Sequence, residues 1–217
     1  MPLMSHAKKA DALAFSPDNR WLATAGDDGT IHAYDLTQSD PTSSAIQFKG
    51  YEDDGTEGTV ALDFSPDSRW LATGGADRTA RLYDMSNQDP AADPTILRAH
   101  LKAILSVEFS QDGRWLATGG NEGIVYLWDM NSPNPAGNPR RLPGKNKIWE
   151  VAFRPPDGKA LATANQDGVV RLWLPTTQDL IDLACQTSGR NMTLAEWQQV
   201  LPDQPYRKTC PQWPEGR

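Results

Sequence analysis

Apolar and polar positions recur in the same order four times along this chain of 217 residues. In the third copy, the segment "ILSVEF" at residues 104–109 alternates between the two kinds of side chain and is rich in branched and aromatic residues, which predicts a β-strand. The turn "SQDGR", the uncharged segment "WLATGG", the turn "NEG" and the segment "IVYLWD" follow in that order. This order predicts three antiparallel strands joined by hairpins.

A fourth short apolar segment, "AIQF", "TILR" or "RRLP", lies between successive copies and completes a unit of four strands. The second strand is the part that is repeated most faithfully. "RWLATGG" begins at Arg69 and Arg114, "RWLATAG" at Arg20 and "KALATAN" at Lys159, at intervals of 49, 45 and 45 residues. Repetition at a nearly fixed period indicates a structural unit that is stacked.

The second strand also indicates how the units stack. Neither face of "WLAT" carries a charge, so both faces of each sheet should be buried. Small antiparallel sheets that are covered on both faces by copies of themselves stack radially in a β-propeller. The sequence therefore predicts an all-β fold, a β-propeller with four blades in this chain. The predicted blades span about residues 6–49, 50–99, 100–143 and 144–174.

The turn between the first two strands of each copy is "SPDNR", "SPDSR", "SQDGR" or "RPPDGK". Pro at the second position and Asn or Gly later in the turn suit a type I hairpin turn. Gly113 can adopt the positive φ that this turn needs, whereas Ser68 is less comfortable there.

The four copies resemble the repeats of the WD-repeat family. Their third strands end in "YD" at residues 34–35 and 83–84, in "WD" at 128–129 and in "WL" at 173–174. In that family a His, a Ser or Thr, a Trp and an Asp form a hydrogen-bonded set that braces each blade. The bracing residues that the resemblance implies are His6, Thr24, Asp28 and Tyr34 in the first blade, Thr73, Asp77 and Tyr83 in the second, His100, Thr118, Glu122 and Trp128 in the third, and Thr163, Asp167 and Trp173 in the fourth.

No copy carries the complete set. Tyr51 stands where the second blade should have its His, Lys145 stands at that position in the fourth blade, and Glu122 replaces the Asp of the third blade. Each missing hydrogen bond removes only about 1 kcal/mol unless a buried group loses its partner. The fold prediction therefore does not depend on complete sets.

Four blades leave the closure of the ring open, because WD-repeat propellers usually have about seven. Residues 1–5 align with the short strand before the third copy, and the family closes its ring by letting one terminus complete the blade of the other. Closure within the chain would give a cramped ring of four blades. Closure between two chains would give a two-fold assembly of eight blades. The third alternative is that the chain is the C-terminal piece of a longer propeller.

The pattern changes in residues 175–217, where helical spacing replaces alternation. The apolar residues of "DLIDLAC" fall on one face of a helix. "TLAE" at residues 193–196 is a capping box, with Met192 and Trp197 placed as its hydrophobic staple. We expect two short helices and a Pro-rich end, which form a cap over the last blade rather than a ligand site because apolar faces must be buried.

This segment resembles the C-terminal ends of bacterial WD-repeat proteins of the STAND class (signal-transduction ATPases). The N-terminal parts of those proteins carry a signalling ATPase or another effector. The segments "LIDLAC", "GRNMTLAEW" and "LPDQPYRKTCP" carry the likeness. It implies that this chain is the C-terminal sensor part of a bacterial signalling protein.

The composition of the chain bears on its partners and on its location in the cell. The chain carries 28 acidic and 21 basic residues, a net charge of −7, which disfavours a nucleic-acid partner because such binding depends on neutralising phosphates. It has no apolar run of 18 residues and no signal-peptide pattern, so we expect a cytoplasmic protein with no membrane partner. Cys185 and Cys210 could pair, but buried free thiols fit a cytosolic chain at least as well.

The sequence contains no motif of known catalytic chemistry. It lacks the phosphate loop GxxxxGK[ST], the zinc motif HExxH, the nucleophile motif GxSxG and the dinucleotide motif GxGxxG. With only His6, His32 and His100, a His-based metal cluster is not expected. We therefore expect no cofactor, no metal and no enzymatic activity.

The remaining candidate for function is surface. In the family, the loops before the first strand and between the second and third strands crowd the face that usually binds partners. The acidic loop at residues 51–58 is longer than its counterparts and is either a docking lobe for a basic partner or a solvated loop. The candidate partner-binding residues are Lys8, Lys9, Glu52, Asp53, Asp54, Glu57, Arg78, Lys102, Lys145 and Lys147.

These observations predict a non-catalytic scaffold that binds or senses other proteins. The alternative is a structural propeller that assembles with a second copy of itself into a homodimeric ring of eight blades and has no other partner.

Overall fold

The computed structural model describes residues 6–48, 50–51, 61–156, 158–174, 185, 190–200, 205–206, 208 and 210. The chain divides into two compact units, Met1–Trp173 and Leu174–Arg217. Every regular element in the described part of the first unit is a β-strand, and the described part of the second unit contains the helix α2 (Leu194–Val200). The predicted all-β fold with a short helical tail is confirmed.

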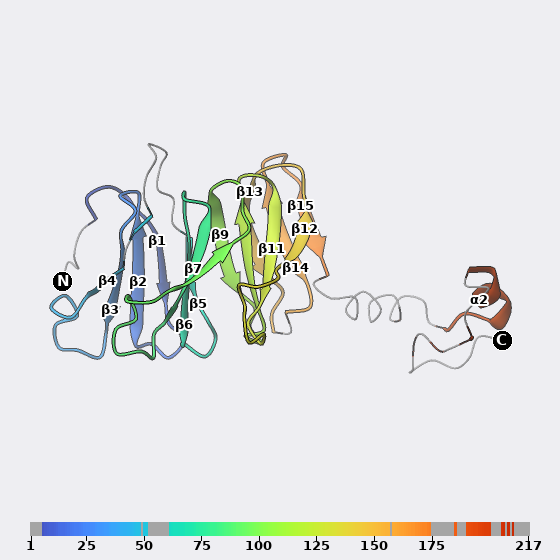
Figure 1. Ribbon diagram of the computed structural model, residues 1–217, viewed down its shortest axis with the longest axis horizontal. Helices are drawn as coiled ribbons and strands as arrows, with labels where there is room; N and C mark the ends of the chain where they lie inside the picture. The colour runs from blue at the N-terminus through green and yellow to red at the C-terminus, as the bar shows by residue number, and fades with distance from the viewer. Residues whose placement is uncertain are drawn as a thin grey trace. The chain divides into compact units, whose positions relative to one another are not determined.

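The first unit consists of four antiparallel sheets, whose strands follow one another in chain order and which lie side by side in Figure 1. The first sheet contains β1 (Ala10–Phe15), β2 (Trp21–Gly26), β3 (Ile31–Asp35) and β4 (Ile46–Phe48). The second contains β5 (Ala61–Phe64), β6 (Trp70–Gly74), β7 (Thr79–Asp84) and β8 (Thr95–Arg98). The third contains β9 (Ile104–Phe109), β10 (Trp115–Gly120), β11 (Ile124–Asp129) and β12 (Arg140–Pro143). The fourth contains β13 (Ile148–Phe153), β14 (Leu161–Asn165) and β15 (Val170–Trp173).

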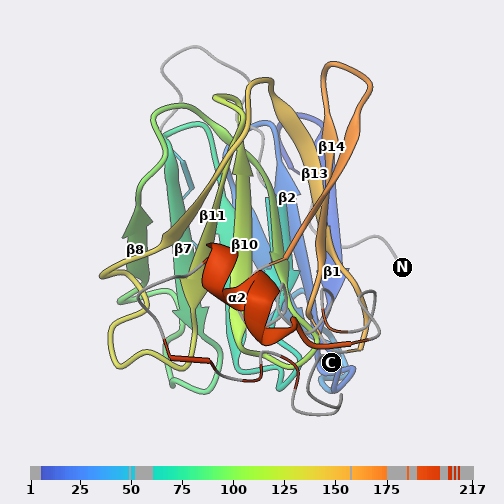
Figure 2. The same ribbon diagram turned by 90° about the vertical axis from the view of Figure 1, so that its right-hand side faces the viewer.

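Each sheet is one predicted blade, and the four form a partial propeller. The fourth sheet has three strands among the described residues, one fewer than the others. The segment predicted to complete a blade, residues 1–5, lies outside the described residues. The strands of successive sheets run in similar directions in the perpendicular view of Figure 2.

The turn between the first two strands of each sheet adopts the expected conformation. Asn19, Ser68 and Gly113 occupy equivalent positions and have φ values of 61°, 60° and 72°. As expected, Ser68 has a backbone conformation that is unfavourable for a residue with a side chain. Its hydroxyl accepts a hydrogen bond of 3.0 Å from the backbone N–H of Asp18. The turns of the first two blades are therefore tied together through this side chain.

The core lies between the sheets rather than inside any one of them. Between the third and fourth sheets, Trp115 and Leu127 of one sheet pack with Val151 and Phe153 of the next. Similar clusters join the first sheet to the second and the second to the third. Because the inner sheets bury both faces, the uncharged second strand has the environment that the sequence predicts.

The second unit contains the predicted capping box. The backbone N–H of Glu196 donates to the Thr193 hydroxyl at 3.1 Å, and the N–H of Thr193 donates to the Glu196 carboxylate at 2.8 Å. Trp197 is buried and its ring contacts Tyr206, whereas Met192, the other half of the predicted staple, is 41% exposed. The helix predicted in "DLIDLAC" lies outside the described residues apart from its last residue.

Cys185 and Cys210 form a disulfide. Of the two alternatives that the sequence left open, free thiols are therefore wrong and pairing is observed. The Asn191 side chain holds Cys210 in place, since its amide nitrogen donates to the Cys210 carbonyl at 3.0 Å and its oxygen accepts the Cys210 N–H at 2.9 Å. Asn191 is itself buried, so the disulfide lies in a packed part of this unit.

Candidate functional site

The polar side chains of the third blade form one continuous hydrogen-bond chain. Trp128 donates from Nε1 to Oγ1 of Thr118 at 3.0 Å, and the same oxygen lies 2.8 Å from Nε2 of His100. The other ring nitrogen of His100 lies 2.6 Å from a carboxylate oxygen of Glu122. Glu122 also accepts the backbone N–H of Leu101 at 3.3 Å. The chain therefore connects the third strand of the blade to the loop that precedes its first strand.

Glu122 does here what the family pattern assigns to an Asp. Burial is the largest single influence and would raise the pKa of its carboxyl. The hydrogen bond and charge of His100, together with backbone hydrogen bonds, outweigh burial, so the pKa lies below its ordinary value. An ionised carboxylate can only accept, so Nδ1 of His100 is the donor in its contact with Glu122.

The first blade uses an additional threonine. His6 lies 3.0 Å from the Thr24 hydroxyl through Nε2 and 2.9 Å from the Thr30 hydroxyl through Nδ1. Thr30 donates to Asp28 at 2.6 Å, and Asp28 also accepts the backbone N–H of Ala7. Burial would raise the pKa of Asp28, but the hydrogen bonds from Thr30 and Ala7 hold it well below its ordinary value. The sequence predicted His6, Thr24 and Asp28 but did not indicate Thr30.

Tyr34, the last predicted member of the first set, is fully buried and stacks on His32 with ring centroids 6.3 Å apart. His32 is also buried, and its ring lies edge-on to His6 at 5.1 Å. Burial, together with the charge of His6, lowers the pKa of His32. The environment therefore favours the neutral form of this imidazole.

Tyr51 takes the position of the missing His in the second blade. Its hydroxyl lies 2.5 Å from Oγ1 of Thr73, and burial raises its pKa far above the ordinary value. The guanidinium of Arg81 lies 4.2 Å from the centre of the Tyr51 ring and donates to Asp77 at 2.8 Å. Asp77 is therefore connected to Tyr51 through Arg81. Tyr83, the last predicted bracing residue of this blade, is buried.

The fourth blade lacks the imidazole and replaces it with an amide. Trp173 donates to the Thr163 hydroxyl at 3.2 Å, and Thr163 donates to the side-chain oxygen of Asn165 at 2.9 Å. Lys145, which aligns with the histidines, is exposed at the surface. Asn165 therefore supplies the acceptor for Thr163 in the blade where Lys145 replaces the histidine.

Asp167 has its own partners in this blade. It forms an ion pair with Arg171 at 2.6 Å and accepts a hydrogen bond from the Asn146 side chain at 2.8 Å. The hydrogen bond from Arg171 is the main reason that the pKa of Asp167 lies well below its ordinary value.

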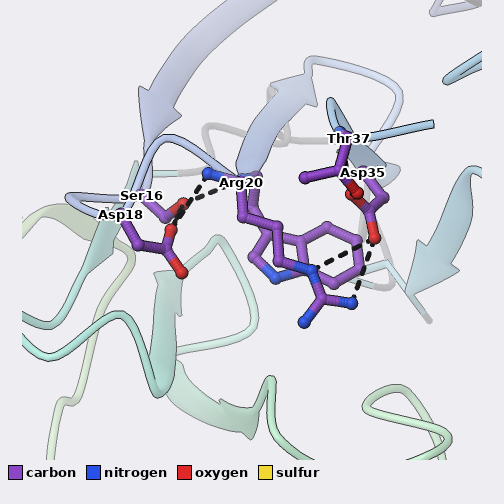
Figure 3. A network of polar contacts seen from close by, with 6 residues as sticks. Ser16, Asp18, Arg20, Asp35 and Thr37 are labelled. Carbon is purple, nitrogen blue, oxygen red and sulfur yellow. Dashed lines mark hydrogen bonds and ion pairs between the residues drawn. The ribbon is translucent and has the colours of Figure 1, made fainter. Parts of the chain in front are cut away.

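A second polar network lies at the opposite edge of the first three sheets, and Figure 3 shows that of the first blade. Arg20 donates from Nε and Nη2 to Asp35 at 3.1 and 3.0 Å, and its guanidinium lies 4.8 Å from the centre of the Trp21 ring. Asp18 accepts the Ser16 hydroxyl and the backbone N–H of Arg20. The network joins the turn between the first two strands to the end of the third.

The same network recurs in the next two blades. Arg69 pairs with Asp84 at 2.8 Å, and Arg114 pairs with Asp129 at 3.7 Å. In the sequence, the Asp of "YD" and "WD" is recognisable only as a family signature. One sequence pattern does indicate the ion pair of this Asp. An Arg lies 15 residues before it in the first three copies, and the fourth copy lacks this Arg.

The loops before each first strand and those between the second and third strands lie at one edge of the sheets. Backbone hydrogen bonds join the two kinds of loop, from Asp27 N–H to the Lys9 carbonyl at 2.8 Å and from Asn121 N–H to the Ala103 carbonyl at 2.9 Å. We call this edge the loop face. The bracing sets fix it, because Asp28 and Glu122 accept backbone N–H groups of these loops.

The loop face carries most of the predicted partner-binding residues that the structure describes. Trp149 is 53% exposed, with the Lys147 ammonium 3.6 Å from its ring centre, and Leu101 is 72% exposed. Neither apolar residue could be identified from the sequence, because an isolated apolar residue in a loop or at a strand end has no distinctive pattern. The basic residues on this face are Lys8, Lys9, Arg78, Lys102, Lys145 and Lys147. The predicted acidic residues Glu52, Asp53, Asp54 and Glu57 lie outside the described residues.

Two half-buried carboxylates join the first strands of neighbouring blades. Asp63 on β5 accepts the backbone N–H of Phe109 at 2.7 Å, and Glu108 on β9 accepts that of Phe153 at 2.9 Å. Burial raises the pKa of Asp63 to about 6. Burial and the negative charge of Asp63 raise the pKa of Glu108 to about 7. In the part of the chain that the structure describes, no group of three or more His, Cys, Asp or Glu is placed to hold a metal ion.

Four segments of the chain match the family described as WD domain, G-beta repeat, at residues 3–35, 47–84, 94–129 and 138–173. The chain belongs to this family. Each matched segment ends at the last residue of a third strand, where the structure places Asp35, Asp84, Asp129 and Trp173. WD repeats generally mediate protein–protein interactions. No curated protein matches the chain. No described helix has the length and apolarity needed to cross a membrane.

Proposed function

We propose that this WD-repeat chain is a non-catalytic scaffold that binds another protein through the loop face. The observation that carries the proposal is the exposure of Trp149 and Leu101 among basic side chains. Tryptophan is enriched among residues that dominate binding energy, and a flanking cation adds charge selectivity. The hydrogen-bond chains beneath the loops support this role, because a surface that is already ordered loses less entropy on binding.

The charges of the loop face favour an acidic partner. Lys102 and Lys145 are exposed, whereas Glu122 and Asp167 on neighbouring loops of the same face are engaged with His100 and Arg171. The prediction that residues 51–58 dock a basic partner concerns a segment outside the described residues and stays a prediction.

A crosslinking experiment tests the loop face. A photoreactive amino acid at Leu101 should crosslink a partner in cells, and the same group at the exposed Gln88, in the turn between the third and fourth strands, serves as the control. With that partner purified, Trp149→Ala should weaken binding about tenfold, or about 1.4 kcal/mol, and Lys102→Glu should weaken it most at low salt. Equal crosslinking from the two positions, or full affinity in both variants, would contradict the proposal.

The second part of the proposal is that the chain is the C-terminal sensor part of a bacterial signalling protein. It rests on the likeness of the C-terminal segment to the ends of STAND-class proteins. Sequencing the genomic DNA upstream of the codon for Met1 tests it. An in-frame effector, such as an ATPase with a phosphate loop, would support the proposal, and an unrelated upstream gene would count against it.

A cytoplasmic location belongs to the same proposal, and the disulfide weighs against it. Disulfides form and persist mainly in oxidising compartments. Labelling with maleimide at the moment of cell lysis shows whether the two cysteines are oxidised or reduced in the cell. From the structure we expect Cys185 and Cys210 to be labelled only after reduction, whereas immediate labelling of both would show reduced thiols and a cytosolic redox state.

A second candidate function is self-assembly into a structural ring. The observation that favours it is the exposure of apolar side chains on the outer faces of the first and fourth blades.

A further inference from the structure

The first strands of the second, third and fourth blades each present an apolar pair to the preceding blade. In the fourth blade this pair is Val151 and Phe153, which are 3% and 6% exposed. The equivalent residues of the first blade, Leu13 and Phe15, are 67% and 59% exposed. The first blade therefore carries a face of the type that packs against a preceding blade, and among the described residues this face is exposed.

The third strand presents an apolar pair in the opposite direction. In the third blade Val125 and Leu127 are 0% exposed because the fourth blade covers them. Their equivalents in the fourth blade, Val170 and Leu172, are 71% and 70% exposed. The equivalent pairs of the first and second blades are also buried. The fourth blade thus carries a face of the type that packs against a following blade.

The two exposed faces match each other. Every interface inside the chain joins the third-strand face of one blade to the first-strand face of the next, and the exposed faces are one of each. Both pairs are exposed, so the four blades do not cover each other in a ring within one chain. A second copy brings one face of each type and raises the number of blades to eight, which lies within the range of known propellers.

Polar groups along the first strands agree with this pairing. The Ser106 hydroxyl on β9 accepts the backbone N–H of Val151 on β13 at 3.1 Å. Glu150 holds the position of Ser106 in the fourth blade and is exposed, and Leu13 holds the position of Val151 in the first. A copy that continued the stack would bring an acceptor, the Glu150 carboxylate, to the N–H of its partner's Leu13.

We propose that two copies of the chain close into a ring of eight blades, in which the fourth blade of each copy packs against the first blade of the other. The proposal specifies the self-assembly candidate and is independent of the loop face. The ring has two equivalent contacts related by two-fold symmetry, and each buries Leu13 and Phe15 of one copy against Val170 and Leu172 of the other.

Light scattering after size-exclusion chromatography of the full chain tests this arrangement across a dilution series. The expected mass is twice the chain mass of 23.9 kDa and persists on dilution. Leu172→Glu and Leu13→Lys should each weaken the dimer at least 100-fold, because each places a charge in both contacts. Mixing the two variants should restore the dimer, since one of its contacts is then unaltered and the other pairs Lys with Glu.

Leu101→Glu is the matched control, because Leu101 is as exposed as Leu172 but lies on the loop face. It should leave the dimer intact. Circular dichroism should show the same strand content in all variants. A monomer at every concentration would overturn the proposal and would favour the cap predicted for residues 175–217. A dimer that survives Leu172→Glu, or open-ended oligomers, would overturn it as well. None of these outcomes would affect binding of a partner to the loop face.

Discussion

Replacing Trp128 by Ala is expected to lower the free energy of unfolding by about 3–5 kcal/mol. Trp128 is 0% exposed and packs in the cluster between the second and third blades, so its removal leaves a large cavity. The change also removes the Nε1–H donor to Thr118 and with it the first link of the chain to His100 and Glu122. Urea unfolding followed by circular dichroism measures the difference.

Two comparisons separate packing from hydrogen bonding. Trp128→Phe keeps an aromatic ring but loses the donor, and should cost about 1–2 kcal/mol. Trp149→Ala, the same truncation at a half-exposed position, should cost less than about 1 kcal/mol. A cost for Trp128→Ala no larger than that for Trp149→Ala would show that the interface between these two blades contributes little to stability.

The stability of the first unit is expected to fall as the pH rises from about 4 to about 7. The pKa of Asp63 is raised to about 6 and that of Glu108 to about 7, in both cases chiefly by burial. The folded chain therefore binds more protons than the unfolded chain between the ordinary carboxyl pKa and these values. Their contribution is fully present below pH 4 and is lost as the pH rises through the folded pKa values.

The double variant Asp63→Asn, Glu108→Gln isolates this contribution. The amide oxygens can still accept the N–H groups of Phe109 and Phe153, but neither side chain acquires a charge. At pH 8 the double variant should be more stable than the natural chain by about 2–4 kcal/mol, after allowance for the partial exposure of both groups. At pH 4 the two should have nearly equal stability. Urea unfolding at a series of pH values measures both differences.

Asp167→Asn is the control for this experiment. The pKa of Asp167 is lowered, mainly by Arg171, so it is ionised in both states of the chain above pH 5. Its replacement should change stability by the same amount at pH 5 and at pH 8. His32, whose pKa is lowered by burial, contributes an opposite slope near its ordinary pKa, but that slope is present in every variant and cancels in the differences. A double variant with the pH dependence of the natural chain would contradict the prediction.

The sequence predicted the features that depend on neighbours along the chain. Alternation located the first strands, and the turn residues located the hairpins, down to the positive φ of Ser68 and Gly113. The capping box at Thr193 needed only its spacing of three residues. Each of these features is set by local geometry, so one segment contains all the information required.

Features that depend on contact between distant segments were predicted less well. Asp63 and Glu108 lie in strands that alternate normally, and nothing in the sequence shows that each reaches the backbone of the next blade. Lys145 stands where the histidine of the fourth blade is expected, and a long cationic side chain is favoured at the surface. The sequence did not show that Asn165 accepts from Thr163 in its place. Trp149 was missed because it lies at the bulge at the start of β13, which the sequence does not reveal.

Each described sheet is built from one uninterrupted stretch of chain, which matters during synthesis on the ribosome. A blade can complete its strand pairing as soon as its own residues have emerged, without waiting for a distant segment. The next blade follows after 45 residues in the later copies, roughly 2–9 s at ordinary rates of translation. At each stage the nascent chain therefore exposes only the two end faces of the growing stack, and a chaperone would have to shield only these.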